Sequence, residues 1–474
     1  MAKDDSSIPT GRIRRTAKVA QVIGASGAGY AGARARSVGR GTERRTEQLD
    51  RVHMEAAERM VDALGNMKGA AMKIGQLASF IDTDFLPPDY RELYQEKLSK
   101  LRASAPPMPW KDVKAVLEDE LEEPVDELFA SFEHEAAAAA SIGQVHRAVL
   151  VDGREVAVKV QYPKVARALE ADLQNAGMIL RLAKAIAPGL DARAAARELR
   201  ERVMEELDYE YEAQNQRTFA RAYRGHPFIY VPDVVTRLSR RRVLVTEWVD
   251  GRSFDAAKEL PQEEQDRIAE IIYRFYYGSI YHLQHFNADA HPGNYLLMED
   301  GKVAFLDFGM TKQLDKEQIE LEIAALEAVF DNEPERLRSA LQDLGFLSNP
   351  KRVDAERLME HVKAVGGWYM EDRELTIDSE LVMRAIAASS DPRSEFFDVM
   401  RRENLPANEM MGRRMEAGVL AVLGQLSATR NWWQIGREWW FCGEPATELG
   451  REEWAYFEGK GERRVRKFAA RATT

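Results

Sequence analysis

Three polar residues in the second half of the 474-residue chain have the types and spacing to hold a metal ion and a phosphate. Asp289 and Asn294 lie five residues apart on a loop that contains proline and glycine. Asp307 follows 18 residues after Asp289, at the end of an apolar run, and Gly309 permits a sharp turn there. Two carboxylates and an amide carbonyl are hard oxygen ligands, which suits Mg²⁺ bound to a polyphosphate.

Three ionisable residues earlier in the chain extend this set. Lys159 ends the apolar run Val156–Lys159, and a buried lysine is costly unless it meets an anion. Asp208 and Glu212 lie four residues apart in a predicted helix, where they would share a face. Taken singly, a strand lysine usually reaches solvent and an acidic helix face is usually solvated. The order of all these motifs, however, is that of a protein-kinase-like fold.

The elements that must position these residues follow from the hydrophobic periodicity. Two β-hairpins are expected, each with a strand on either side of a glycine-containing turn. Long apolar-periodic stretches indicate helices between and after them. The predicted helices cover 46–80, 89–101, 110–122, 172–186, 192–219 and 262–286, and the chain is expected to be helical throughout from 316 to about 430; the predicted strands cover 146–151, 155–160, 243–249, 295–298 and 303–306.

Composition and charge exclude several classes of protein. The net charge of −11 argues against a nucleic-acid binder, and 45% apolar residues argue against general disorder. The single cysteine, Cys442, rules out an intramolecular disulfide and a multi-cysteine metal site. No apolar run approaches the roughly 18 residues of a membrane span, and the N-terminus lacks the apolar core of a signal peptide. The sequence therefore predicts a cytoplasmic protein.

Four motifs are similar to those of the UbiB family of atypical kinases, also called the AarF-domain kinases. They are Lys73-Ile-Gly-Gln76, the alanine-rich stretch Ala136–Ser141, Glu206-Leu207-Asp208 and Ala288–Asn294. The resemblance covers roughly residues 52–315. It implies a loop of alanines over the nucleotide where other kinases have glycines, which disfavours positive φ and stiffens the loop.

The resemblance implies a role for each matching residue. Lys159 would hold the α- and β-phosphates and pair with Glu212, and Asp289 would be the catalytic-loop aspartate. Asn294 and Asp307 would bind Mg²⁺. The implied nucleotide-binding set is Ala137, Ala138, Ala139, Ala140, Ser141, Val145, Lys159, Glu247 and Val249; the implied gating set, at the mouth of the site, is Lys73, Gln76, Glu206 and Asp208. One departure is Asn287, where the family usually has histidine.

The fold class expected from this resemblance is α+β, an atypical kinase-like bilobal fold with a helical N-terminal extension. The expected domains are a basic N-terminus (1–46), the helical extension (47–125), an N-lobe (126–250), a C-lobe (251–445) and a basic C-terminal tail (446–474). The basic ends are either solvated or contact anionic lipid. The five tryptophans between 432 and 454 favour core packing over a lipid-binding surface.

The expected function is an Mg²⁺-dependent ATPase or atypical kinase that uses ATP, or binds ADP, in support of isoprenoid-quinone or other lipid metabolism. Expected partners are the nucleotide, an anionic membrane surface or isoprenoid lipid, and proteins of such a pathway, with peripheral binding at the inner face of a membrane. Two alternatives stay open: a nucleotide-gated scaffold without turnover, and an ordinary protein kinase. The absence of an Ala-Pro-Glu motif after Asp307 counts against the protein kinase.

Overall fold

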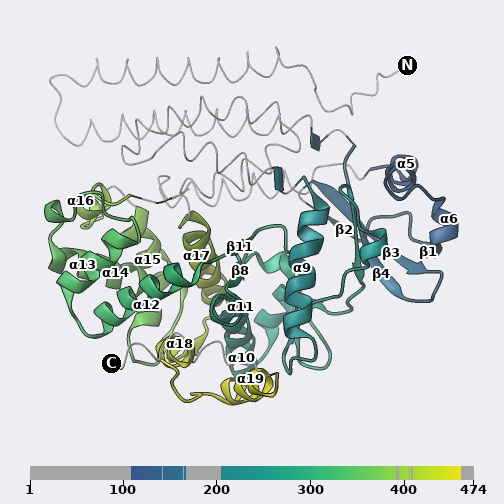
Figure 1. The fold of residues 1–474 in the computed structure, drawn as a ribbon. Coiled ribbons are helices and arrows are strands. Elements are labelled where there is room, and N and C mark those ends of the chain that lie inside the picture. The colour runs from purple at the N-terminus through teal and green to yellow at the C-terminus, as the bar shows by residue number, and fades with distance from the viewer. Residues whose placement is uncertain are drawn as a thin grey trace, which may run out of the picture.

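The computed structural model describes residues 108–460, apart from 141, 164, 167–203, 206, 391–393, 405 and 407–408. Within this part the chain forms a small β-rich lobe and a larger helical lobe, with helix α9 (Tyr209–Tyr223) between them (Figure 1). This confirms the predicted α+β kinase-like fold. The predictions for Lys73, Gln76, Ser141 and Glu206 fall outside the described residues.

The N-lobe is built on an antiparallel sheet in which neighbouring strands follow the order β1-β3-β4-β6, and β2 pairs with β3. The first predicted hairpin is confirmed: its strands pair from Gly143 with Gln161 to Val149 with Glu155, and Gly153 in the turn has φ of 88°. Alternate residues of β3 and β4 are buried, as expected for a sheet with one covered face. The strands are β1 (Phe129–Phe132), β2 (Ala138–Ala139), β3 (Gly143–Leu150), β4 (Glu155–Gln161) and β6 (Val243–Glu247).

Two helices before the sheet cover its buried face. Helix α5 (Trp110–Leu121) presents Val113 and Leu117 one turn apart, and both are completely buried. They pack in one cluster with residues of β3, β4 and β6. The short helix α6 (Val125–Leu128) joins the same cluster. We therefore place α5 with the N-lobe, although it lies within residues 47–125.

Helix α9 begins with a cap rather than continuing a longer helix. The predicted helix over 192–219 is broken at Leu207 and Asp208, and the Asp208 carboxylate accepts a hydrogen bond from the backbone N–H of Glu210. Aspartate at this position satisfies a free N–H at the helix start, which explains why the helix begins at Tyr209. Asp208 and Glu212 therefore do not share a helix face as predicted.

Short strands bring the catalytic segments together in the C-lobe. One sheet has the order β5-β10-β9-β7, and a two-stranded sheet pairs β8 with β11. The second predicted hairpin is confirmed by the antiparallel pairing of β9 with β10. The strands are β5 (Ile229–Tyr230), β7 (Arg252–Ser253), β8 (His285–Asn287), β9 (Tyr295–Leu297), β10 (Val303–Phe305), β11 (Thr311–Gln313), β12 (Leu375–Thr376) and β13 (Thr429–Arg430).

The predicted helix over 262–286 was wrong at its C-terminal end. Helix α10 (Gln262–Tyr273) passes through a π-helical turn, η4 (Arg274–Gly278), into α11 (Ser279–Leu283). Gln284 then adopts a left-handed conformation with φ of 54°, which ends the helix and lets β8 begin. This reversal directs the chain into the loop that carries Asp289 and Asn294.

The rest of the C-lobe is mainly helical, although β12 and β13 interrupt the continuous run predicted for 316–430. The helices are α12 (Lys316–Phe330), α13 (Pro334–Asp343), α14 (Ala355–Met370), α15 (Ser379–Ser390), α16 (Phe397–Met400), α17 (Met410–Gln425), α18 (Trp432–Trp440) and α19 (Glu448–Gly459); short 3₁₀ turns are η2 (Thr236–Leu238), η3 (Phe254–Glu259), η5 (Pro292–Asn294) and η6 (Pro350–Arg352). Among the described residues, no helix is both long and apolar enough to cross a bilayer.

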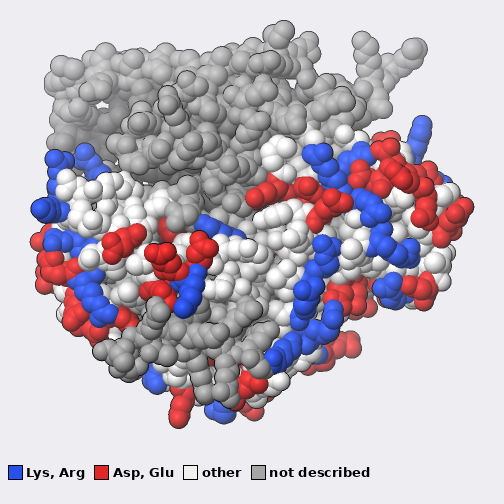
Figure 2. All heavy atoms as spheres, viewed as in Figure 1, with Lys and Arg blue, Asp and Glu red and all other residues white. Residues whose placement is uncertain are grey.

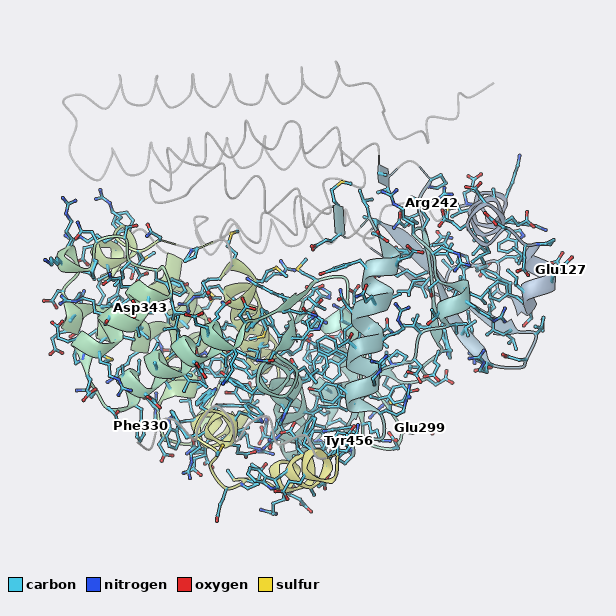
Figure 3. All side chains as sticks on the ribbon, viewed as in Figure 1. Glu127, Arg242, Glu299, Phe330, Asp343 and Tyr456 are labelled. Carbon is cyan, nitrogen blue, oxygen red and sulfur yellow. The ribbon has the colours of Figure 1, made fainter. Side chains whose placement is uncertain are left out.

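All five C-terminal tryptophans were predicted to pack in the core, and the prediction is confirmed for four of them. Trp432, Trp433, Trp439 and Trp440 are buried in the C-lobe cluster, whereas Trp454 is half-buried. Helix α19 lies within the predicted basic tail, and its Leu449 and Phe457 join that cluster. Figure 3 shows the labelled Tyr456 on α19, at the edge of the helical lobe close to the lower end of α9.

Candidate nucleotide and phosphoryl-transfer site

Lys159, Glu212 and Asp307 converge between the two lobes, as the sequence predicted. The ammonium of Lys159 lies 2.8 and 2.9 Å from the two carboxylate oxygens of Glu212. It also lies 3.4 Å from Oδ2 of Asp307. These contacts join β4 to α9 and to the segment after β10; Glu212 lies 53 residues after Lys159 in the sequence, and Asp307 lies 148 residues after it.

The charges of this cluster hold one another in place. Burial works to lower the pKa of Lys159, but the carboxylates of Asp307 and Glu212 outweigh it and raise that pKa well above its usual value. Lys159 is therefore charged at neutral pH. Its ammonium also lies 5.0 Å from the ring centre of the buried Tyr209. A fixed cation beside a half-buried carboxylate is a suitable receptor for phosphate oxygens and a metal ion.

The turn after Asp307 depends on glycine. The backbone N–H of Gly309 donates to Oδ1 of Asp307 at 2.9 Å. A β-carbon at position 309 would lie 3.3 Å from that same oxygen and 3.6 Å from Oε2 of Glu212. A side chain here would therefore crowd the carboxylate of Asp307, which favours glycine at this turn.

Asp289, the predicted catalytic-loop aspartate, is held in place by several contacts. Its backbone N–H donates to Oδ1 of Asn287 at 2.8 Å, and its carbonyl oxygen accepts from the Tyr276 hydroxyl at 3.0 Å. The Asn294 amide donates to Oδ2 of Asp289 at 3.1 Å. The structure thus brings together the two polar residues that the sequence placed on this loop.

Asn287 ties the two catalytic segments to each other. Its side-chain N–H donates to the carbonyl oxygen of Asp307 at 2.6 Å, while its Oδ1 accepts from Asp289. The backbone N–H of Ala288 donates to the carbonyl of Met310 at 2.8 Å. Asparagine therefore fills, with both ends of its amide, the position where the resemblance led us to expect histidine.

One residue of the site was missed from the sequence. Arg414, on α17, donates from its guanidinium to Oδ1 of Asp289 at 2.8 Å. The two residues are 125 positions apart, and the surrounding stretch Met410–Gly418 contains no motif that would single Arg414 out. Only the packing of α17 on the catalytic loop reveals it.

The alanine-rich loop forms a tight extension of the N-lobe sheet. Ala138 and Ala139 pair with Val145 and Gln144 of β3, and the N–H groups of Ala137 and Ala140 donate to β3 carbonyls. Ala137 to Ala139 are exposed. A loop whose N–H groups are engaged in a ladder is stiffer than a free glycine loop, which agrees with the predicted effect of alanine.

Three of the residues predicted to bind the nucleotide lie on β3 or at and just after the end of β6. Val145 lies directly opposite Lys159 in the β3–β4 ladder, so both side chains are on the same face of the sheet. The Glu247 carboxylate instead accepts from the hydroxyl of Tyr230 at 2.8 Å and the N–H of Asp233 at 2.9 Å. Val145 beside Lys159, the backbone of Glu247 and the half-buried Val249 therefore remain the candidates for contacts with a base.

The oxygen donors fit a metal shared with phosphates better than a site made by protein alone. Among the described residues, no group of three or more His, Cys, Asp or Glu side chains could hold a metal ion. Asn294 uses its amide N–H groups on Asp289, which leaves its carbonyl oxygen to face another ligand. Asp307 and Asn294 would thus supply two ligands, and Mg²⁺ commonly takes the rest from phosphates and water.

A cavity of about 490 Å³ lies within the C-lobe, lined by residues of α11, α12, α14, α15 and α17. None of the predicted catalytic or nucleotide-binding residues lines it, but Arg414 does. Figure 2 shows acidic and basic side chains interspersed over both lobes on the visible face. The predicted site therefore does not line this cavity, and Arg414 is the residue that reaches both.

The two lobes and the lysine–glutamate pair are those of a protein-kinase-like domain. A sequence model described as the ABC1 atypical kinase-like domain matches residues 100–341, about half of the chain. The chain therefore belongs to the ABC1 family of atypical kinases, which confirms the resemblance to the UbiB and AarF proteins.

Individual relatives agree. The atypical kinase coq-8, mitochondrial, of Caenorhabditis elegans is 32% identical over 73% of this chain and 46% of its own length. The atypical kinase COQ8B, mitochondrial, of Rattus norvegicus is 35% identical over 62% of this chain and 55% of its own. The chain thus spans about half the length of these curated relatives. The structure of Rv3197 from Mycobacterium tuberculosis, in complex with erythromycin, is similar with a TM-score of 0.60 and 32% identity, covering 83% of this chain and 97% of that one.

Proposed function

We propose that this protein binds ATP or ADP with Mg²⁺ and transfers the γ-phosphoryl group of ATP to water or to a small or lipid-related acceptor. The observation that supports this proposal is the convergence of Lys159, Glu212 and Asp307 beside a loop that presents Asp289 and Asn294. Each position needed for phosphoryl transfer by a kinase-like site has a residue of suitable chemistry. A degenerate site would be expected to lack at least one of them.

The residues of the chain would divide the work as follows. Lys159, fixed by Glu212, would bind phosphate oxygens, and Asp289 would orient the acceptor hydroxyl or water. Asp307 and Asn294 would hold Mg²⁺, which when bound neutralises charge on the phosphates. The alanine loop would cover the nucleotide. Catalysis would then rest on positioning and charge compensation.

By family membership, we propose that this activity supports isoprenoid-quinone or related lipid metabolism at a membrane surface. Two relatives, coq-8 of Caenorhabditis elegans and COQ8B of Rattus norvegicus, are named as mitochondrial proteins. For this chain, peripheral contact with anionic lipid and with proteins of the pathway is part of the proposal. Lys73, Gln76, Glu206 and Asp208 remain the proposed gating residues.

The decisive experiment compares wild type with Asp307→Asn and Asp289→Asn, with and without anionic liposomes. We expect Mg-nucleotide to raise the unfolding temperature of wild type and Asp289→Asn but not of Asp307→Asn. Phosphate release should fall by about 100-fold or more in Asp289→Asn. Asp300→Asn, an exposed acid that pairs with Lys302 in the β9–β10 turn, is the matched control and should behave as wild type.

The outcomes separate the candidate functions. Stabilisation by nucleotide without phosphate release under any condition would favour the nucleotide-gated scaffold. Phosphate transfer to added protein substrates would favour an ordinary protein kinase. No stabilisation of wild type by any Mg-nucleotide would contradict the assignment of the site.

A further inference from the structure

Helix α17 reaches the catalytic loop with one charged side chain. The guanidinium of Arg414 lies 2.8 Å from Oδ1 of Asp289, and the side chains are 17% and 20% exposed. This is a charge-assisted hydrogen bond between mostly buried groups, which is stronger than a surface ion pair. Arg414 therefore acts on the residue proposed to orient the acceptor.

A glycine one turn further along α17 permits this approach. A β-carbon at Gly418 would lie 3.1 Å from the β-carbon of Ala290, next to Asp289 in the catalytic loop. Residues four apart share a helix face, so Arg414 and Gly418 both face the loop. The helix is thus seated directly on the loop, and Arg414 is delivered to Asp289 by this close packing.

The two oxygens of the Asp289 carboxylate are held from different sides. Oδ1 accepts from Arg414 and Oδ2 accepts from Asn294 at 3.1 Å. Two donors on separate elements, α17 and η5, fix both the position and the rotation of the carboxylate. Removing either would let the carboxylate turn away from the acceptor.

Charge compensation gives a second reason for an arginine here. Asp289 and Asp307 are both acidic, and they would lie near the phosphates of a bound nucleotide. Lys159 is 2.8 Å from Glu212 and so is already shared with another carboxylate. Arg414 offsets the charge of Asp289 without lying among the proposed phosphate-binding residues.

We propose, resting on the function proposed above, that Arg414 is a positioning residue for phosphoryl transfer. It fixes the carboxylate of Asp289 toward the acceptor and offsets its charge, and Gly418 is the residue that lets α17 place it there. The inference concerns the turnover step: nucleotide binding depends on other residues.

The test measures steady-state phosphate release and unfolding temperature for the full chain with Mg-ATP. Arg414→Met should lower kcat about 10- to 100-fold while KM changes less than about three-fold, because misplacing a reacting group affects turnover more than binding. Arg414→Lys should recover part of the loss, since lysine keeps the charge but not the planar fork. Gly418→Ala should also lower kcat, because the added β-carbon would push α17, and with it Arg414, away from Ala290 and Asp289.

Arg413→Met is the matched control. Arg413 precedes Arg414 on α17 but pairs with Glu416 at 3.0 Å, away from the loop. A folded Arg413→Met protein should keep its kcat within about two-fold of wild type. A folded Arg414→Met protein with unchanged kcat, or an equal loss in Arg413→Met, would overturn the proposal.

The failure of this proposal can be told apart from failure of the proposed function. If wild type releases phosphate and folded Arg414→Met does so equally well, only the role of Arg414 is wrong. If wild type releases none in any condition, phosphoryl transfer itself is wrong and the role of Arg414 falls with it. A lowered unfolding temperature with normal kcat would show a structural contact alone, and would also overturn the proposal.

Discussion

Glu212 cannot lose its partner without a large cost, because its side chain is 4% exposed. We predict that Lys159→Met lowers the free energy of unfolding by about 3–5 kcal/mol, since it leaves a buried carboxylate without a cation. Urea unfolding measures this directly. Lys114→Met is the control: Lys114 and Glu118 form an exposed pair at 3.6 Å, and its loss should cost less than about 0.5 kcal/mol. Equal losses in the two variants would contradict the prediction.

The raised pKa of Glu322 leads us to expect that its contribution to stability falls as the pH rises, whereas that of most carboxylates in proteins increases. Burial, with the nearby carboxylates of Glu409 and Glu416, raises the pKa of Glu322 to about 8. A carboxyl whose pKa is higher in the folded state stabilises the fold below its unfolded pKa, and this contribution is lost as the pH rises toward 8. Glu322→Gln should therefore raise the unfolding temperature relative to wild type most above pH 8.

The same comparison contains its own control. Below about pH 4.5 Glu322 is protonated in the folded and the unfolded chain, so the difference between Glu322→Gln and wild type should be small there. A difference that stays constant from about pH 4 to about pH 9 would show that the pKa of Glu322 is the same in the folded and unfolded chain, and a variant destabilised at high pH would show that the carboxylate form is stabilised; either result contradicts the prediction.

For individual residues, the sequence predicted those that belong to local motifs. Lys159, Glu212, Asp289, Asn294 and Asp307 each stand in a short pattern whose order defines a kinase-like fold, and the structure brings Lys159, Glu212 and Asp307 into contact. Arg414 could not be predicted, because an arginine on a helix face has no distinguishing neighbours. The side chain of Glu247 was also unpredictable, since its partners Tyr230 and Asp233 lie on a different segment.

Among the elements, the β3–β4 hairpin depends on the small size of Gly143. A β-carbon there would lie 2.2 Å from the carbonyl oxygen of Val160, which is backbone and cannot move aside. We predict that Gly143→Ala destabilises the protein by about 1–3 kcal/mol and weakens nucleotide binding through the adjoining alanine loop. Thermal unfolding with and without Mg-nucleotide measures both effects.

Gly412 on α17 provides the contrasting substitution. A β-carbon there meets nothing within 4 Å, and the residue lies inside a helix. Gly412→Ala should therefore leave the protein unchanged or stabilise it by up to about 1 kcal/mol. If both alanine variants behaved alike, close packing against Val160 would not be the reason for glycine at position 143.

Helix ends were harder to predict than hairpins for a physical reason. Alternating apolar residues on either side of Gly153 and Gly301 predict the hairpins, and both glycines have a positive φ, of 88° and 82°. The end of α11 is set by Gln284 at φ of 54°, a conformation that usually selects glycine or asparagine. Periodicity alone therefore extended that helix into β8.

For the molecule as a whole, Arg274 joins three segments of the C-lobe. Its fully buried guanidinium contacts Glu270 at 2.9 Å on α10, Glu438 at 2.9 Å on α18 and Glu453 at 2.8 Å on α19. Burial raises the pKa of Glu453 to about 7, against the opposing effect of Arg274. The Arg274 guanidinium is thus shared by three carboxylates, of which Glu270 also pairs with Arg430 at 3.0 Å.

We predict that Arg274→Met destabilises the protein by about 3–5 kcal/mol, because several buried carboxylates lose their counter-charge. It should also release α19, which limited proteolysis after α18 would detect. Arg384→Met, which removes an exposed pair with Glu380, should change neither stability nor cleavage. A stable Arg274→Met protein with a protected C-terminus would contradict the role of this network.

The attachment of α19 has a mechanical consequence for the nucleotide site. Near the end of α9, the carbonyl of Ala222 accepts hydrogen bonds from the Tyr456 hydroxyl and the Lys460 ammonium. Near the start of the same helix, the carboxylate of Glu212 pairs with Lys159 of β4. Helix α9 is therefore tied to β4 near its start and to α19 near its end, and we expect these contacts to limit the movement of one lobe against the other. Nucleotide exchange should then proceed through small openings and be slow, and shortening the chain before α19 should speed it.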